Sequence, residues 1–167
     1  MLIRDESCDD WTLVAELYGE AFESSAEARL VAALRHSQVA RISLIIEEGM
    51  RLVGHIMFTA VTLDTAPELK IMGLAPMAVI PDRQRCGFGS ALVEEGLVRC
   101  HSTDCGAVVA LGYSQFYQKF GFEAASTWGI SCHYEVPDDV FMVRELEPGY
   151  LGQLGGRISY HPKFDDL

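Results

Sequence analysis

The sequence has little positive charge, since 13 Lys and Arg residues stand against 24 Asp and Glu residues and leave a net charge of −11. Such a chain repels a polyphosphate backbone, so general binding of nucleic acids is disfavoured. Long apolar runs are also missing, because no stretch approaches the roughly 20 uninterrupted apolar residues that a membrane-spanning helix needs. We therefore expect a soluble protein that binds neither nucleic acid nor membrane. A local basic pair, Arg83 and Arg85, still allows a small anion to bind.

Paired cysteine motifs and a secretory signal are absent as well. The five cysteines are odd in number, and no two have the two-residue spacing of a zinc knuckle or a dithiol redox motif. Reduced thiols and no metal site are the expectation. The N-terminus, Met1-Leu2-Ile3-Arg4-Asp5-Glu6, is acidic where a secretory signal is basic, and no cleavage site follows it. We predict a cytoplasmic protein, while a monomer and a homodimer both stay open.

No linker, internal repeat or low-complexity run divides the 167 residues, so we predict a single domain with a core over residues 1–146 and an extension over 147–167. Hydrophobic periodicity predicts strands over residues 2–4, 41–48, 51–63, 71–80, 107–111 and 140–146, and helices over residues 9–22, from 25 onward, 88–100 and 114–120. The order predicts an α+β fold with a mixed, mostly antiparallel sheet, flanked by helices and containing a central β-α-β unit. Within that unit, strands 71–80 and 107–111 should be parallel neighbours. The tail from Gly149 is poorly determined by pattern.

The most informative segment places two glycines where a strand turns into a helix. The first turn of a helix has unpaired N–H groups and the positive end of the helix dipole, so it can hold a phosphate. Gly87 and Gly89 remove side chains that would keep the phosphate away. A dinucleotide-binding fingerprint does not fit, because Leu92 stands where its third glycine belongs. A Walker loop does not fit either, because no Gly-Lys-Ser/Thr occurs.

Two segments carry a family resemblance. Gln84-Arg85-Cys86-Gly87-Phe88-Gly89 resembles the acyl-CoA pyrophosphate motif of the GNAT superfamily of N-acetyltransferases. The segment from Leu111 to Phe122 resembles a later motif of that family, in which a short helix carries a tyrosine four residues before a Gly-Phe pair. The element order is similar to the family's fold over roughly residues 1 to 146, and the tail after Leu146 resembles its YhbS-like branch.

The resemblance implies acetyl-CoA as co-substrate, no metal, and a set of cofactor-binding residues. The pyrophosphate would lie on the loop and helix start, which here are Gln84, Arg85, Cys86, Gly87, Phe88, Gly89 and Ser90. The pantetheine arm would pair with the backbone of Met77, Ala78 and Val79. Pro76 fits this role, because proline cannot donate to a ladder and favours an opened strand. Gly112-Tyr113-Ser114 departs from the family, which often has asparagine there, and Cys86 stands where arginine, lysine or glycine is usual.

Acetyl transfer to an amine needs a base for the amine proton and an acid for the CoA thiolate. The resemblance makes Tyr117 the candidate acid, with packing of its ring as the alternative. The base is not indicated, because Glu27, Glu47, Glu48, His55 and His133 are all candidates without a distinctive spacing. His55, inside a strand, is more readily explained as a core histidine.

The predicted function is acetyl-CoA-dependent N-acetylation of a primary amine of a small molecule or protein. The alternative is a non-catalytic acyl-CoA-binding regulatory or interaction module of the same fold, although retention of both Tyr117 and the glycine loop favours the enzyme. A nucleotide-dependent enzyme is a third hypothesis. The sequence does not identify the amine.

Overall fold

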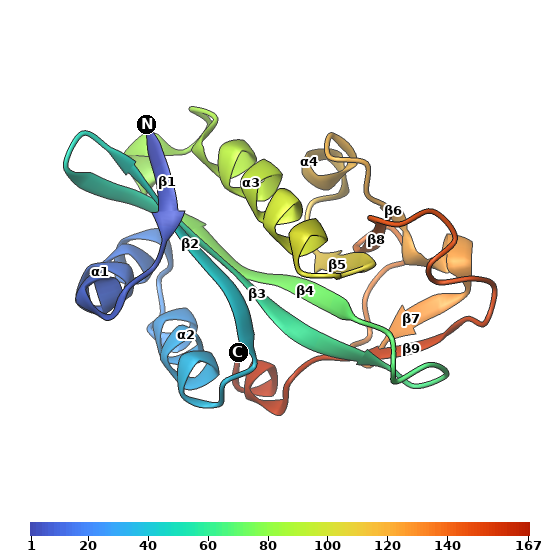
Figure 1. The fold of residues 1–167 in the computed structure, drawn as a ribbon. Coiled ribbons are helices and arrows are strands. Elements are labelled where there is room, and N and C mark those ends of the chain that lie inside the picture. Colours follow the sequence, from blue (N-terminus) through green and yellow to red (C-terminus); the bar gives the residue numbers. More distant parts are fainter. The chain divides into compact units, whose positions relative to one another are not determined.

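The computed structural model describes every residue from Met1 to Leu167 and forms two compact units. Unit 1 comprises Met1–Thr59, Pro76–Gly96 and Pro162–Leu167, and unit 2 comprises Ala60–Ala75 and Leu97–His161. Strands β3 (Arg51–Leu63) and β4 (Ile71–Val79) and helix α3 (Phe88–Ser102) pass from one unit to the other. The predicted fold class is confirmed, since the strands form a mixed, mostly antiparallel sheet flanked by helices (Figure 1). The single domain stays a prediction.

Unit 1 contains an antiparallel group of strands with helices on both faces. Strand β1 (Leu2–Asp5) pairs with β2 (Ala40–Glu48), and β2 pairs with β3 through the predicted turn, where Gly49 has a φ of 64°. A 3-10 turn, η1 (Cys8–Asp10), leads into α1 (Trp11–Ala21), and α2 (Ala26–His36) follows. Helices α1 and α2 lie along one face of these strands and the first part of α3 lies along the other (Figure 1). A C-terminal 3-10 segment, η4 (Pro162–Asp166), packs on α2.

The burial pattern of β3 shows that this sheet is covered on both faces. All residues from Val53 to Thr59 are buried, although successive side chains of a strand point to opposite faces. A Cβ added to Gly96 of α3 would lie 2.3 Å from the ring of Phe58, so this side of β3 faces α3. The side chain of His55 points to the opposite face of β3, where its Nδ1 lies 2.9 Å from the hydroxyl of Tyr18 of α1. The continuous apolar run of β3 thus reflects burial of both faces.

Unit 2 contains the β-α-β part of the fold. The start of β4 pairs in parallel with β5 (Ala107–Leu111), and α3 lies between them in the chain, as predicted. Strand β5 pairs antiparallel with β8 (Phe141–Glu145), which also pairs with β6 (Glu123–Ala124). Strand β9 (Gly156–Ser159) is parallel to β7 (Ile130–Cys132) and antiparallel to the end of β3. Helix α4 (Ser114–Gln118) and the 3-10 turn η3 (Ala125–Trp128) complete the unit.

The differences from the predicted elements lie in short segments. Strands β6, β7 and β9 have two to four residues each, too few for an alternating pattern to be recognised. In the tail, Gly155 and Gly156 have φ values of 62° and 125°, so a turn leads directly into β9. The register of β4 with β5 ends at Leu74, two residues before Pro76, which agrees with the predicted irregularity of that strand. No helix combines the length and apolarity required to cross a membrane.

Candidate functional site

The glycine-rich loop of unit 1 joins a 3-10 turn, η2 (Pro81–Arg83), to the start of α3. Two of its residues have a left-handed backbone, Arg85 with a φ of 60° and Gly87 with a φ of 91°. For Arg85 this conformation costs about 1–2 kcal/mol, because the residue has a Cβ. Left-handed residues allow successive N–H groups to converge into anion-binding concavities. Gln84 holds the loop in place, since its Nε2 donates to the carbonyl of Val79 at 3.0 Å.

Helix α3 presents its unpaired N–H groups directly after this loop. The first helical hydrogen bond runs from the N–H of Ala91 to the carbonyl of Gly87 at 3.0 Å. The N–H groups of Phe88, Gly89 and Ser90 therefore precede the helical ladder. Phe88 is buried and fixes the helix start, whereas a Cβ on Gly87 would meet no atom within 4 Å. Gly87 is thus required by its backbone conformation, and the space beside it is open to a ligand.

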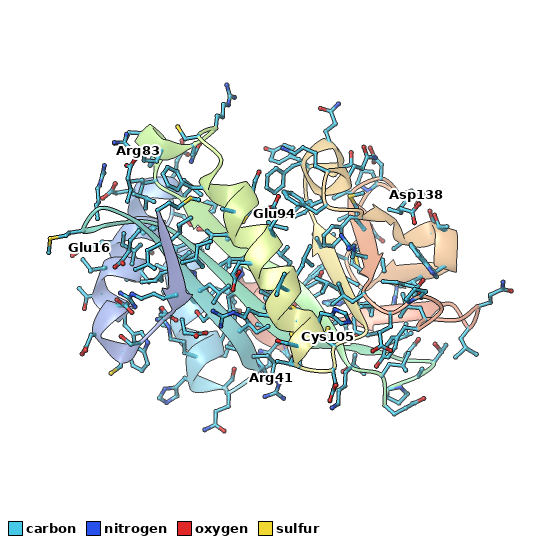
Figure 2. All side chains as sticks on the ribbon, turned by 45° about the horizontal axis from the view of Figure 1, so that its top comes forward. Glu16, Arg41, Arg83, Glu94, Cys105 and Asp138 are labelled. Carbon is cyan, nitrogen blue, oxygen red and sulfur yellow. The ribbon has the colours of Figure 1, made fainter.

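The two arginines near the loop differ in their availability. Arg83, on η2 (Figure 2), pairs with Glu48 through Nε at 2.6 Å and lies 3.5 Å from the Asp82 carboxylate. Arg85 is exposed and makes no ion pair in the protein. The charge of Arg83 is therefore already balanced by acidic neighbours, and Arg85 carries the positive charge that an incoming anion would meet.

The predicted pantetheine-binding residues lie at the unit 1 end of β4. Ala78 is buried, while Met77 and Val79 on either side of it are half-buried. The Ile80 N–H, just beyond the strand, donates to the carbonyl of Val53 at 3.0 Å, which fixes the end of β4 beside β3. These residues directly precede the glycine-rich loop, so unit 1 brings together all ten of the predicted cofactor-binding residues.

Tyr117 lies in unit 2, on α4. Its ring packs against Phe116 and Phe122 with centroid distances of 5.1 and 5.5 Å, and only 7% of the residue is exposed. The hydroxyl forms no hydrogen bond within the protein. Burial raises the pKa of Tyr117 to about 12, so the phenol stays protonated at neutral pH. The residue therefore has a packed ring and a free hydroxyl that can donate a proton.

Gly112 lies close to the ring of Tyr117. Its φ is 152°, and a Cβ there would lie 3.1 Å from the ring of Tyr117. A residue with a side chain at this position would press against the ring. The glycine thus permits the observed position of Tyr117.

The candidate bases are mostly engaged. His55 is fully buried, with Nδ1 at 2.9 Å from the Tyr18 hydroxyl and Nε2 at 2.8 Å from the Ser43 hydroxyl. Burial lowers the pKa of His55, and both ring nitrogens are engaged, as expected for a core histidine. Glu47 pairs with Arg4 at 3.1 Å, and Glu48 pairs with Arg83. The remaining candidates are Glu27, which accepts a hydrogen bond from Ser24 at 3.3 Å, and His133, whose Nδ1 lies 3.4 Å from the Ile158 carbonyl.

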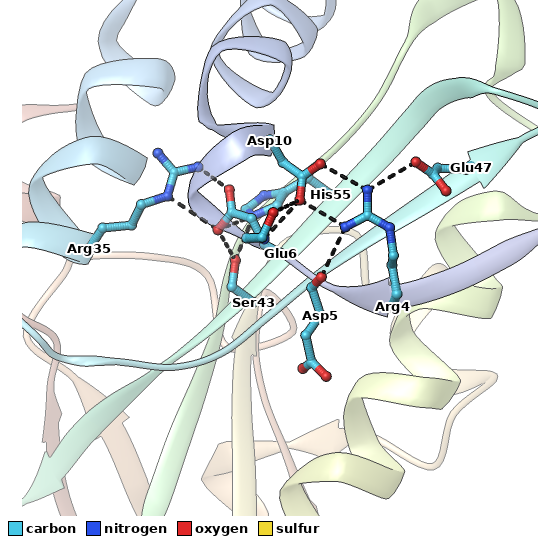
Figure 3. Close-up of polar contacts among 9 residues, drawn as sticks. Arg4, Asp5, Glu6, Asp10, Arg35, Ser43, Glu47 and His55 are labelled. Carbon is cyan, nitrogen blue, oxygen red and sulfur yellow. Dashed lines mark hydrogen bonds and ion pairs between the residues drawn. The ribbon is translucent and has the colours of Figure 1, made fainter.

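His55 belongs to a buried polar network in unit 1 that the sequence did not reveal (Figure 3). Glu6 is its centre and accepts hydrogen bonds from Arg35 and, at 2.6 Å, from the Ser43 hydroxyl. Burial would raise the pKa of Glu6, but His55, Arg35 and Ser43 outweigh burial and lower this pKa to about 2. Beside it, Arg4 joins Asp10 and Glu47, which are 6 and 43 residues away in the sequence. No spacing rule links such partners, so only the fold shows them.

Comparison with known proteins places these features in a family. The acetyltransferase (GNAT) domain family matches residues 3–125. The uncharacterized N-acetyltransferase YhbS of Escherichia coli strain K12 is 33% identical over 167 residues, which cover 99% of both chains. The uncharacterized N-acetyltransferase YjhQ of the same strain is 36% identical over 141 residues, which cover 82% of this chain and 77% of YjhQ.

Solved structures give the same result. The crystal structure of YhbS from Escherichia coli in complex with CoA has a TM-score of 0.92 at 32% identity and covers 98% of this chain and 91% of that one. A GNAT family acetyltransferase from Brucella melitensis in complex with acetyl-CoA has a TM-score of 0.82 at 29% identity and covers 98% and 97%. The resemblance inferred from the two sequence motifs, including its YhbS-like branch, is confirmed. The chain belongs to the GNAT acetyltransferase family.

Proposed function

We propose that the protein is an acetyl-CoA-dependent N-acetyltransferase that moves an acetyl group to a primary amine of a small molecule or protein. The observation that carries the proposal is the start of α3, where the N–H groups of Phe88, Gly89 and Ser90 lie beside the unpaired Arg85. Helix starts of this kind bind phosphate groups. The CoA and acetyl-CoA in the two similar crystal structures support a pyrophosphate as the anion. We also propose that the enzyme acts in the cytoplasm.

The loop and β4 would bind different parts of acetyl-CoA. Backbone N–H groups from Gln84 to Ser90 would hold the pyrophosphate, and Arg85 would add charge. The backbone of Met77, Ala78 and Val79 would pair with the amides of the pantetheine arm, in the manner of an added strand. Because backbone atoms do this binding, conservative side-chain changes at Met77 and Val79 should have small effects on affinity.

The chemistry requires one bond to form and one to break. A neutral amine nitrogen attacks the thioester carbonyl carbon, the carbon–sulfur bond breaks, and CoA leaves as a thiolate that needs a proton. We propose Tyr117 as the donor of that proton, because its hydroxyl is protonated at neutral pH and has no partner within the protein. The proton lost by the amine passes to a base or to water. No side chain is assigned as the base.

Thermal unfolding tests the cofactor assignment. A ligand that binds only the folded state stabilises it by about 2.7 kcal/mol at 100 times its dissociation constant. Acetyl-CoA at millimolar concentration should therefore raise the melting temperature of the wild type. Gly89→Glu should abolish the rise, because it places bulk and negative charge at the helix start. Gly19→Glu is the matched control, since Gly19 lies on the exposed side of α1 with no atom within 4 Å of an added Cβ.

The outcomes separate the alternatives. If acetyl-CoA does not stabilise the wild type, the cofactor assignment is wrong. Stabilisation by magnesium-ATP instead would favour a nucleotide-dependent enzyme. A screen of amines with release of the CoA thiol as readout then tests turnover. Binding of acetyl-CoA without turnover of any amine would favour the non-catalytic binding module.

A further inference from the structure

Unit 2 contains a pocket that the cofactor site does not use. It encloses about 70 Å³ and is partly open to solvent, so it is below the range for drug-sized ligands and has room for only part of a small molecule. It is formed by η3, β7, the loop after β7 and the start of β8. The floor is apolar and buried, with Ala125, Ile130 and Phe141 each at most 4% exposed. Such a floor suits an aliphatic chain.

One carboxylate lies at the rim of the pocket. Asp138 lines it from the loop that precedes β8 (Figure 2), and its carboxylate has no ion-pair partner in the protein. Glu135 and Asp139 lie on the same loop, and no Lys, Arg or His is among the lining residues. A negative rim over an apolar floor is complementary to a cation with an aliphatic body.

The pocket is joined to Tyr117 by backbone contacts within unit 2. Phe141 in its floor is the register partner of Leu111, the last residue of β5. The next residue, Gly112, donates its N–H to the carbonyl of Val140 at 3.1 Å, and a Cβ added to it would lie 3.1 Å from the ring of Tyr117. The pocket therefore lies at the end of the β5–β8 pair from which the helix carrying Tyr117 begins.

We propose that this pocket binds one ammonium group and the aliphatic spacer of a small diamine, which is the acetyl acceptor. The proposal rests on the proposed N-acetyltransferase function. An amine held as an ammonium ion at Asp138 has no lone pair and cannot attack a thioester. A diamine meets both requirements, since one nitrogen is held as a cation and the other reacts when neutral. The second nitrogen then forms the amide bond, loses its proton to water, and displaces the CoA thiolate.

Binding without acetyl-CoA tests the site itself. Titration of 1,6-diaminohexane into the protein, followed by NMR shifts, should perturb the residues that line the pocket, whereas the uncharged 1,6-hexanediol should not. Asp138→Asn should weaken the diamine about two- to fivefold, the effect of one solvent-exposed ion pair, and added salt should weaken it further. Asp139→Asn is the matched control, because it removes the same charge from a residue that does not line the pocket, and it should weaken binding less than Asp138→Asn.

A second pair of variants tests whether the space in the pocket is needed. Ser126→Phe should fill the pocket and prevent binding, while Thr127→Phe, the next residue and equally exposed, should bind normally. The proposal is overturned if the wild type does not bind the diamine, if the diol binds as tightly, or if each variant and its control behave alike.

Acetylation assays then separate this proposal from the proposed function. The diamine should be acetylated, and 1-aminohexane, with its single nitrogen held at Asp138, should inhibit that reaction competitively. If the diamine binds but acetyl-CoA does not stabilise the protein, the proposed enzyme function fails and the cation site stands. If acetyl-CoA is consumed with other amines while the diamine does not bind, the enzyme function stands and the diamine site is wrong.

Discussion

The Tyr117 hydroxyl can be removed with little change in packing, so Tyr117→Phe separates structure from chemistry. The ring contacts with Phe116 and Phe122 are retained by phenylalanine. A hydrogen bond contributes about 0.5–1.5 kcal/mol to stability, but this hydroxyl makes none within the protein. We therefore expect the free energy of unfolding to change by less than about 0.5 kcal/mol.

Turnover should respond much more strongly than stability. If the hydroxyl protonates the leaving thiolate, kcat should fall about 10²-fold, the usual scale of general acid catalysis, which corresponds to about 2.7 kcal/mol in the barrier. The KM for acetyl-CoA should stay nearly constant, because the contribution is made in the transition state. The assay is steady-state kinetics with a competent amine, together with denaturant unfolding of the same samples.

Tyr113→Phe is the matched control for this prediction. Tyr113 is 87% exposed and precedes α4, so its change also removes one phenolic oxygen but should leave kcat near the wild-type value. A near-normal kcat for Tyr117→Phe would remove Tyr117 from the mechanism. A loss of stability comparable to the loss in kcat would instead assign the residue to packing alone.

Three further predictions follow from unit 1. Arg85→Ala should weaken acetyl-CoA about fivefold by calorimetry, while Arg83→Ala should have less effect because its charge is already balanced by acidic neighbours. The pKa of Glu6 is lowered to about 2, so the unfolded state binds a proton at higher pH than the folded state does. The free energy of unfolding should therefore fall as the pH drops from about 4.5 towards 2. Denaturant unfolding of Glu6→Gln should show a flatter pH profile over that range. Gly96→Ala should lower the melting temperature, because overpacking against Phe58 costs about 1–3 kcal/mol, and an unchanged or higher value would contradict the packing argument.

The local sequence pattern predicted much of the fold and of the candidate site. The alternation and length of apolar runs predicted the hairpin of β2 and β3 and the parallel neighbours β4 and β5, because these elements are long or continuously buried. The glycine string from Gln84 to Gly89 predicted the loop and helix start, since its geometry is set by residues adjacent in the chain. The family followed from the same string and from the segment around Tyr117.

Tertiary structure decided what depends on partners distant in the sequence. Arg83 and Arg85 are equivalent in the sequence, yet only the fold brings Glu48 to Arg83 and leaves Arg85 free. Helix propensity alone predicts that alanine at position 96 gains about 1 kcal/mol, whereas the ring of Phe58 occupies the space that its Cβ would need. The pocket at Asp138 is likewise built from segments that no local pattern joins, because burial and charge pairing are properties of the packed chain.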